Sequence, residues 1–159
     1  FATSFDLPSL RSIMRRSDDN GPLSGFKECE GTFPNKVTEY SYHPNPAVSG
    51  QKVTQKTHAI DNEPIEDGSK LNVRAYYKNS LVHNHVTDFC KEWGAGGKCS
   101  GAVGHVQYEN TQIVKDLKNI KHLPRNQPLD MNMRVELHSP QNKTLCCMEG
   151  VFRVIIKDD

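Results

Sequence analysis

Cysteine and histidine are the residue types in this chain that could carry chemistry, and the spacing of the cysteines favours disulfides over a metal site. Cys90 and Cys99 are too far apart for a zinc knuckle, and no second pair follows at the interval that such a site requires. Cys90 and Cys99 flank one glycine-rich loop and are easily joined. Cys29, near the start of the domain, would then pair with Cys146 or Cys147, which leaves one thiol free.

The sequence His83-Asn84-His85 places two imidazoles on the same face of a predicted strand, as two metal ligands would be. A metal site needs further ligands, and no third ligand lies close by in the sequence. We therefore predict surface histidines and no metal, with a pH-responsive role as the alternative.

The glycine-rich segment Gly94-Ala95-Gly96-Gly97-Lys98 superficially resembles a phosphate-binding loop. Lys98 is followed by Cys99 rather than by serine or threonine, and the first glycine is wrongly spaced. The chain also lacks a nucleophile elbow, an HExxH sequence and a carboxylate pair placed beside a nucleophile. We therefore expect a loop tied at its base by cysteines, and a protein that is not an enzyme and holds no cofactor.

Composition sets limits on what these residues can belong to. The 159 residues are 35% hydrophobic with a mean hydropathy of −0.67, so one domain with a modest core is expected. The net charge of +1 gives no electrostatic surface for nucleic acid. Spaced cysteines and the glycosylation sequon at Asn142, in a predicted turn, indicate a protein of the secretory pathway.

Strict alternation of apolar and polar residues predicts a hairpin near the end of the chain. From Leu129 to Leu137 every odd position is apolar and every even position is polar, which is the pattern of a half-buried strand. A turn-forming segment follows, and a second strand is predicted from Leu145 to Ile156. The hairpin thus turns one apolar face toward an interior.

Shorter strands are predicted through the rest of the chain, at 26–33, 37–43, 50–60 and 103–108, with another at 71–77 that could run on to Val86. Residues 113–120 have helix-like spacing, although a loop or strand is equally compatible. Turns about every ten residues predict an all-β sandwich of a single domain, residues 24–159. Residues 1–23 form either an N-terminal arm or a propeptide with Arg15-Arg16 as its processing site.

Several segments, in order, resemble the ML (MD-2-related lipid-recognition) domains. They are Pro44-Asn45-Pro46 followed by Gly50-Gln51, the acidic turn and strand Glu66 to Val73, Asp88-Phe89-Cys90, and Cys147-Met148-Glu149-Gly150. The likeness is greatest to fungal phosphatidylglycerol/phosphatidylinositol transfer proteins and Niemann-Pick C2-like sterol-binding proteins. It covers about residues 26–156. Ser100 departs from it, because the family usually has proline after the mid-chain cysteine pair, and residues 51–58 are more polar than a cavity wall should be.

The resemblance implies an immunoglobulin-like β-sandwich of two antiparallel sheets with a lipid cavity between them. It implies bridges Cys29–Cys147 and Cys90–Cys99, with Cys146 as the free thiol pointing inward. The residues then expected to line the cavity are Val73, Ala75, Tyr77, Leu81, Val106, Tyr108, Leu129, Met131, Met133, Val135, Met148, Gly150, Phe152 and Val154.

The function that this resemblance implies is lipid binding or transfer by a secreted or lumenal protein. The expected ligand is a phospholipid or a sterol, held by a monomer that makes transient membrane contact, with Trp93 as one contact residue. The alternatives are an extracellular Ig-like module that binds another protein and a lipid-sensing co-receptor without transfer activity.

Overall fold

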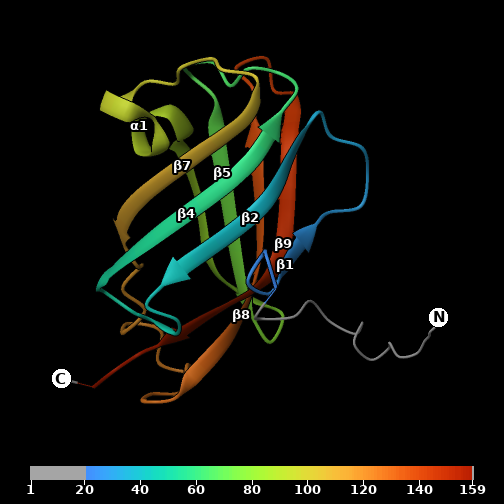
Figure 1. The fold of residues 1–159 in the computed structure, drawn as a ribbon. Coiled ribbons are helices and arrows are strands. Elements are labelled where there is room, and N and C mark those ends of the chain that lie inside the picture. The colour runs from blue at the N-terminus through green and yellow to red at the C-terminus, as the bar shows by residue number, and fades with distance from the viewer. Residues whose placement is uncertain (1–20, 159) are drawn as a thin grey trace.

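In the computed structural model, which describes residues 21–158, two antiparallel sheets face one another as a sandwich (Figure 1). The larger sheet has the strand order β1-β9-β8-β5-β6, with the short strand β3 added in parallel beside β9. The smaller sheet has the order β2-β4-β7. The predicted all-β sandwich is therefore confirmed.

The strand bounds follow from the sequence pattern in most places. The larger sheet contains β1 (Phe26–Glu28), β3 (Ala47–Val48), β5 (Lys70–Tyr77), β6 (Ser80–Asp88), β8 (Pro128–His138) and β9 (Thr144–Ile155). The smaller sheet contains β2 (Asn35–His43), β4 (Lys52–Asp61) and β7 (Gly104–Ile113). The predicted hairpin is β8 and β9, with Met133 opposite Gly150 and Leu137 opposite Cys146.

Several predictions about local structure were wrong or incomplete. The strand expected over 26–33 ends at Glu28, and the strand expected over 103–108 runs on to Ile113. The strand that begins at Lys70 does not run on to Val86, because Lys78 and Asn79 both have positive φ and make the tight turn between β5 and β6. The cysteine-bracketed segment is more than a loop. It begins with the short helix α1 (Phe89–Trp93), where the Asp88 side chain accepts a hydrogen bond from Lys91 N, and continues into the short helix η1 (Ala95–Gly97).

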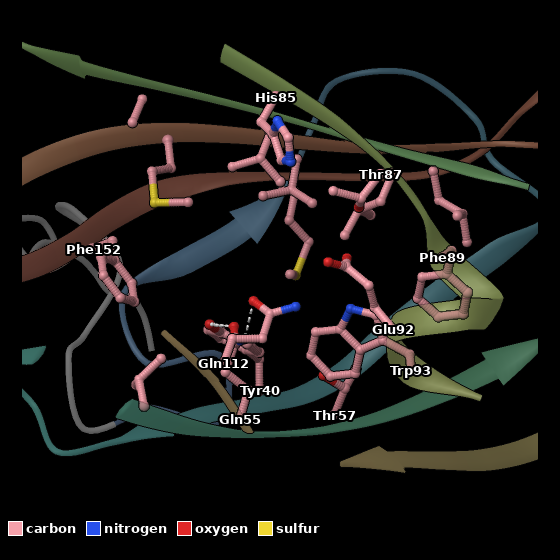
Figure 2. Close-up of a pocket in the computed structure, with 18 of the residues that line it drawn as sticks. Tyr40, Gln55, Thr57, His85, Thr87, Phe89, Glu92, Trp93, Gln112 and Phe152 are labelled. Atoms are coloured by element: carbon pink, nitrogen blue, oxygen red, sulfur yellow. Dashed lines mark hydrogen bonds between the residues drawn. The ribbon is translucent and has the colours of Figure 1, made fainter. Parts of the chain in front are cut away.

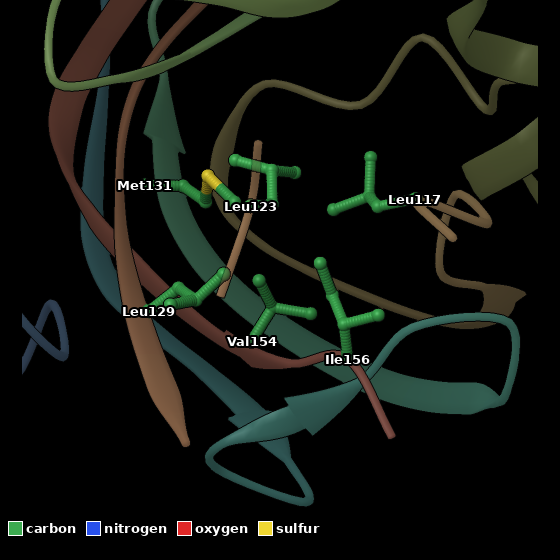
Figure 3. Packing of buried hydrophobic residues seen from close by; sticks show 6 residues of the cluster. All are labelled: Leu117, Leu123, Leu129, Met131, Val154 and Ile156. Atoms are coloured by element: carbon green, nitrogen blue, oxygen red, sulfur yellow. The ribbon is translucent and has the colours of Figure 1, made fainter. Parts of the chain in front are cut away.

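Residues 114–127, whose apolar spacing was compatible with a helix, a strand or a loop, form a loop. They form neither helix nor strand, yet Leu117 and Leu123 are buried against the ends of β8 and β9 (Figure 3). Together with Leu129, Met131, Val154 and Ile156 they make an apolar cluster that closes one end of the sandwich. Among the described residues, no helix is long and apolar enough to span a membrane.

One side of the sandwich is closed by contacts between β1, β2 and β9. Tyr42 stacks near Phe152 with ring centroids 4.5 Å apart, and its hydroxyl accepts a hydrogen bond from Arg153 N at 3.0 Å. Phe26 meets Tyr40 edge-on at 5.3 Å. Pro22 and Leu23 add to this side, since Pro22 O accepts from Tyr40 N and Leu23 packs on the same cluster. Residues 1–20, most of the predicted arm or propeptide, lie outside the described residues.

Two disulfides fix the ends of this framework. Cys29, just after β1, is bonded to Cys147 on β9, and Cys90 on α1 is bonded to Cys99. These are the pairings that the resemblance implied, and they resolve the choice between Cys146 and Cys147. The alternation along β9 explains the outcome, since Cys147 lies on the opposite face of the strand from Cys146.

Candidate lipid-binding cavity

A cavity of about 620 Å³ lies between the two sheets (Figure 2). This volume falls within the range of sites that enclose small ligands, roughly 300–1,000 Å³. The part of its wall that comes from the larger sheet is apolar except along the edge strand β6. It includes Val73 and Ala75 on β5, Met133 and Val135 on β8, and Phe152 on β9. Such a wall favours hydrocarbon, because it offers area to bury and no partner for a polar group.

Most of the residues assigned to the cavity by resemblance do border it. They are Val73, Ala75, Tyr108, Met131, Met133, Val135, Met148, Phe152 and Val154. Most of them were predicted from strand alternation, since alternate residues of β5, β8 and β9 lie on the inner face of the sheet.

The remaining residues of that set do not border the cavity. Leu81 is 52% exposed at the start of β6, just after the tight turn. Leu129 and Tyr77 pack in the apolar cluster at the closed end. Val106, half-buried near the start of β7, is not among the lining residues either.

Gly150 lies against β1 rather than at the cavity. A Cβ at this position would contact Gly25 O and would lie 2.5 Å from Phe26 Cα. Glycine is therefore required by the close approach of two strands, and a larger residue here would displace β1 instead of filling the cavity.

The smaller sheet supplies a polar part of the wall, which the polar sequence of residues 51–58 did not predict. Gln55, Thr57 and Asp61 on β4 line the cavity together with Gln112 on β7. The strand β4 does form a cavity wall, although its polarity had put that contribution in doubt. The sequence does indicate this inner face, since Gln55 and Thr57 alternate in step with the apolar residues Val53 and Ala59.

Buried Asp61 and half-buried Tyr108 form a polar pair in the cavity wall, close to Cys146. The Tyr108 hydroxyl donates to Asp61 Oδ2 at 3.3 Å. Burial raises the pKa of Asp61 to about 6, although the hydrogen bond from Tyr108 opposes the shift. Burial also raises the pKa of the Cys146 thiol to about 12, with the Asp61 charge contributing. The thiol is therefore protonated at neutral pH and is a poor nucleophile.

The cavity opens between the edge strands β6 and β7, which are not paired with one another. The lining residues that are also exposed mark this mouth: His85 on β6, Glu92 on α1, Ile113 at the end of β7, and Lys115 just after it. His83 lies beside His85, with ring centroids 5.7 Å apart. Burial, the neighbouring His85 and Lys115 all lower the pKa of His83. The histidine pair therefore belongs to the rim of the cavity.

One group of His, Cys, Asp and Glu atoms in residues 21–158 lies close enough together to be considered as metal ligands, namely Asp67, Cys90 and Cys99. Two of its members are joined in a disulfide, so their sulfurs are not thiolate ligands. Asn142 is exposed in the turn between β8 and β9, where its φ is 66°. Glycosylation at that residue stays a prediction.

Comparisons with known proteins identify this fold through structure alone. No family model and no curated protein sequence matches the chain. A Niemann-Pick type C2 protein from Japanese carpenter ant matches with a TM-score of 0.57 and 15% identity, over 83% of this chain and 98% of that one. The C-terminal domain of wzt matches with a TM-score of 0.52 and 8% identity, over 89% and 84%.

Chicken MD-1, solved in complex with lipid IVa, matches with a TM-score of 0.46 and 13% identity, over 79% of this chain and 85% of that one. The two disulfides of this chain are a feature of proteins of the secretory pathway. The chain therefore has the β-sandwich fold of the Niemann-Pick type C2 protein, with both disulfides formed and a cavity between its two sheets.

Proposed function

We propose that this protein binds a lipid in the cavity between its sheets and carries it, as a monomer, in the secretory pathway or outside the cell. The single observation that carries the proposal is the cavity of about 620 Å³, whose inner wall on β5, β8 and β9 is apolar. A closed core would bring these side chains together instead of leaving space between the sheets. The fold shared with the Niemann-Pick type C2 protein and the sequence resemblance to ML domains support the same conclusion.

The free energy of binding would come from burial of hydrocarbon. Each CH2 group that moves from water into the cavity contributes about 0.8 kcal/mol. Methionines at positions 131, 133 and 148 contribute flexible side chains that adapt to a chain or a ring system. Phospholipids and sterols both contain such hydrocarbon, so the proposal includes both as ligands.

The mouth is suited to the polar end of an amphiphile and to brief contact with a membrane. Lys115 provides positive charge on one part of the rim, His83 and His85 provide polar ring nitrogens, and Ile113 is 62% exposed beside them. An exposed apolar residue next to basic groups is the arrangement that favours contact with an anionic lipid surface. Trp93 is half-buried in the cavity wall and packs 6.0 Å from Phe89, so its role is with the ligand rather than with the membrane.

Filling the cavity tests the proposal. Val135 faces the cavity from β8, and Val135→Trp places a large side chain in space that the ligand would occupy. We expect at least about a tenfold loss of affinity for fluorescent sterol and phospholipid, since excluding two CH2 groups already costs about 1.6 kcal/mol. Val86→Trp is the matched control, because Val86 is 56% exposed and does not line the cavity.

Native mass spectrometry of the mildly purified protein gives the second readout. We expect wild type and Val86→Trp to carry lipid and Val135→Trp to carry less. A wild-type monomer without lipid, which also fails to take up either probe, would overturn the proposal and favour a protein-binding module. A loaded protein that moves no lipid between vesicles would retain lipid binding and favour sensing over transfer.

A further inference from the structure

The two walls of the cavity differ in chemistry. On β5, β8 and β9 the lining residues are hydrocarbon or thioether side chains apart from the protonated thiol of Cys146. On the smaller sheet, the lining includes the side-chain amides of Gln55 and Gln112 and the hydroxyl of Thr57. A cavity built only for saturated hydrocarbon has no use for this polar strip, because polar groups lose water without gaining partners when such a ligand enters.

Gln55 is held in place by hydrogen bonds that use most of its capacity. Its Oε1 accepts from the Tyr40 hydroxyl at 2.6 Å. Its Nε2 donates to Asn110 Oδ1 at 3.1 Å and to Gln112 Oε1 at 3.3 Å, so both of its N–H groups have partners. This network crosses all three strands of the smaller sheet and fixes the orientation of the Gln112 amide.

Gln112 is the last residue of this network, and its amide N–H groups are free, within the described part of the chain, to donate a hydrogen bond. Its Oε1 accepts from Gln55, and within residues 21–158 its amide nitrogen donates to no other group. The side chain is half-buried and reaches into the cavity (Figure 2). Among residues 21–158, two more lining residues carry polar atoms without partners, Trp93 Nε1 on α1 and Thr87 Oγ1 on β6, but both atoms are fully buried. The Gln112 amide nitrogen is not buried in this way, so it is the donor that a ligand in the cavity can reach.

We propose that the preferred ligand is an oxygenated lipid, with a hydroxyl or carbonyl oxygen on its hydrophobic body that accepts a hydrogen bond from Gln112 inside the cavity. This proposal rests on the proposed lipid-binding function and adds the class of lipid. A plain hydrocarbon body would cover the Gln112 donor without satisfying it. The expected penalty for such an uncompensated donor corresponds to roughly a fivefold to hundredfold loss of affinity.

The experiment uses matched lipids that differ by one oxygen. One series is octadecanoic acid and its hydroxyoctadecanoic acids, with the hydroxyl at successive positions. The other is a sterol with and without an additional hydroxyl on its ring system or side chain. Binding to the intact protein is measured by displacement of a fluorescent lipid. For wild type, we expect one hydroxyl position to bind about tenfold tighter than the unsubstituted lipid, with other positions weaker.

Gln112→Met replaces the amide by an apolar side chain of similar length. We expect this variant to bind the unsubstituted lipid at least as well as wild type and to lose the preference for the hydroxylated one. Gln107→Met makes the same change at an exposed position of β7 and should leave the preference intact. Gln112→Glu keeps the length but replaces the donor by an acceptor, so it should abolish a preference for the matching oxo-octadecanoic acid, whose ketone oxygen can only accept a hydrogen bond.

The outcomes separate this inference from the function on which it rests. If wild type binds unsubstituted and hydroxylated lipids with equal affinity in both series, the oxygenated-lipid proposal fails while lipid binding stands. If neither series binds and the protein also takes up no fluorescent phospholipid, the proposed function itself fails. If the preference survives in both Gln112 variants, Gln112 is not the donor and the proposal is overturned. If the Gln112 variants do not fold, equal affinity of wild type for every hydroxyl position would still overturn the proposal.

Discussion

At the scale of single residues, Asp61 is the group whose ionisation most directly affects folding. The residue is 2% exposed, and burial raises the pKa of its carboxyl group from 3.8 to about 6. Between about pH 4 and pH 6 the folded protein therefore holds a proton that the unfolded chain has released. The free energy of unfolding should fall as pH rises through this window, which is the opposite of the usual behaviour of a salt-bridged aspartate.

Asp61→Asn removes this dependence while keeping the size of the side chain. Relative to the variant, wild type should lose on the order of 2–3 kcal/mol of stability between pH 4 and pH 7. Urea unfolding at a series of pH values measures both profiles. Tyr108 and Cys146, which face Asp61, stay protonated over this range because burial raises the pKa of each. Parallel profiles for the two proteins would show that Asp61 is not buried as described.

Gly150 is the second residue with a sharp prediction. Gly150→Ala should destabilise the protein by about 1–3 kcal/mol, because the added Cβ would lie against Phe26 Cα and force β1 away from β9. Thermal unfolding measures the loss, and amide hydrogen exchange should show faster exchange at Val151, whose N–H bonds to Gly25 O. An unchanged midpoint with unchanged exchange would contradict the close approach of the two strands.

At the scale of elements, the two disulfides should contribute unequally to stability. Cys29–Cys147 spans 118 residues and Cys90–Cys99 spans 9. In the chain-entropy model these loops correspond to about 5 and about 3 kcal/mol. Cys29→Ala with Cys147→Ala should therefore lower the free energy of unfolding more than Cys90→Ala with Cys99→Ala. Urea unfolding of the two double variants makes the comparison, and an equal or reversed order would contradict it.

The strands that the sequence predicted well are those with one dry and one wet face. In β8 the alternation of Leu129, Met131 and Met133 with polar neighbours was enough to predict the strand, because one face of the hairpin is solvated. The turn at Lys78-Asn79 was missed because the apolar pattern on either side resembles one continuous strand. The helix α1 was missed because five residues are too few to show a helical period.

The polar part of the cavity wall could not be predicted with the same rule. Polarity in β4 suggested a solvated strand, yet Gln55 lies inside because its partners Asn110 and Gln112 lie across the sheet on β7. Those partners are 55 and 57 residues away in the sequence, so no local pattern identifies them. Hydrogen bonds between strands thus determine that Gln55 faces the cavity, which the hydrophobic alternation of β4 does not predict by itself.

At the scale of the whole molecule, ligand binding and folding should be linked. A lipid that binds only the folded sandwich stabilises it by about 2.7 kcal/mol when present at one hundred times its dissociation constant. We expect delipidated wild type to gain thermal stability on titration with its ligand, and Val135→Trp to gain much less. Differential scanning calorimetry measures the shift. A wild-type midpoint that does not respond to saturating lipid would contradict a site formed only in the native state.

The opening between β6 and β7 has a consequence for the behaviour of the protein in concentrated solution. A mouth between two strands requires that both keep a row of backbone N–H and C=O groups without a neighbour in the sheet. Such rows can template pairing between molecules, and Val86 and Ile113 add exposed hydrocarbon to them. The polar side chains of Asn84, His85 and Glu109 on these strands then act as gatekeepers against edge-to-edge aggregation. The strand edges that are open to pairing between molecules and the opening to the cavity thus lie on the same two strands.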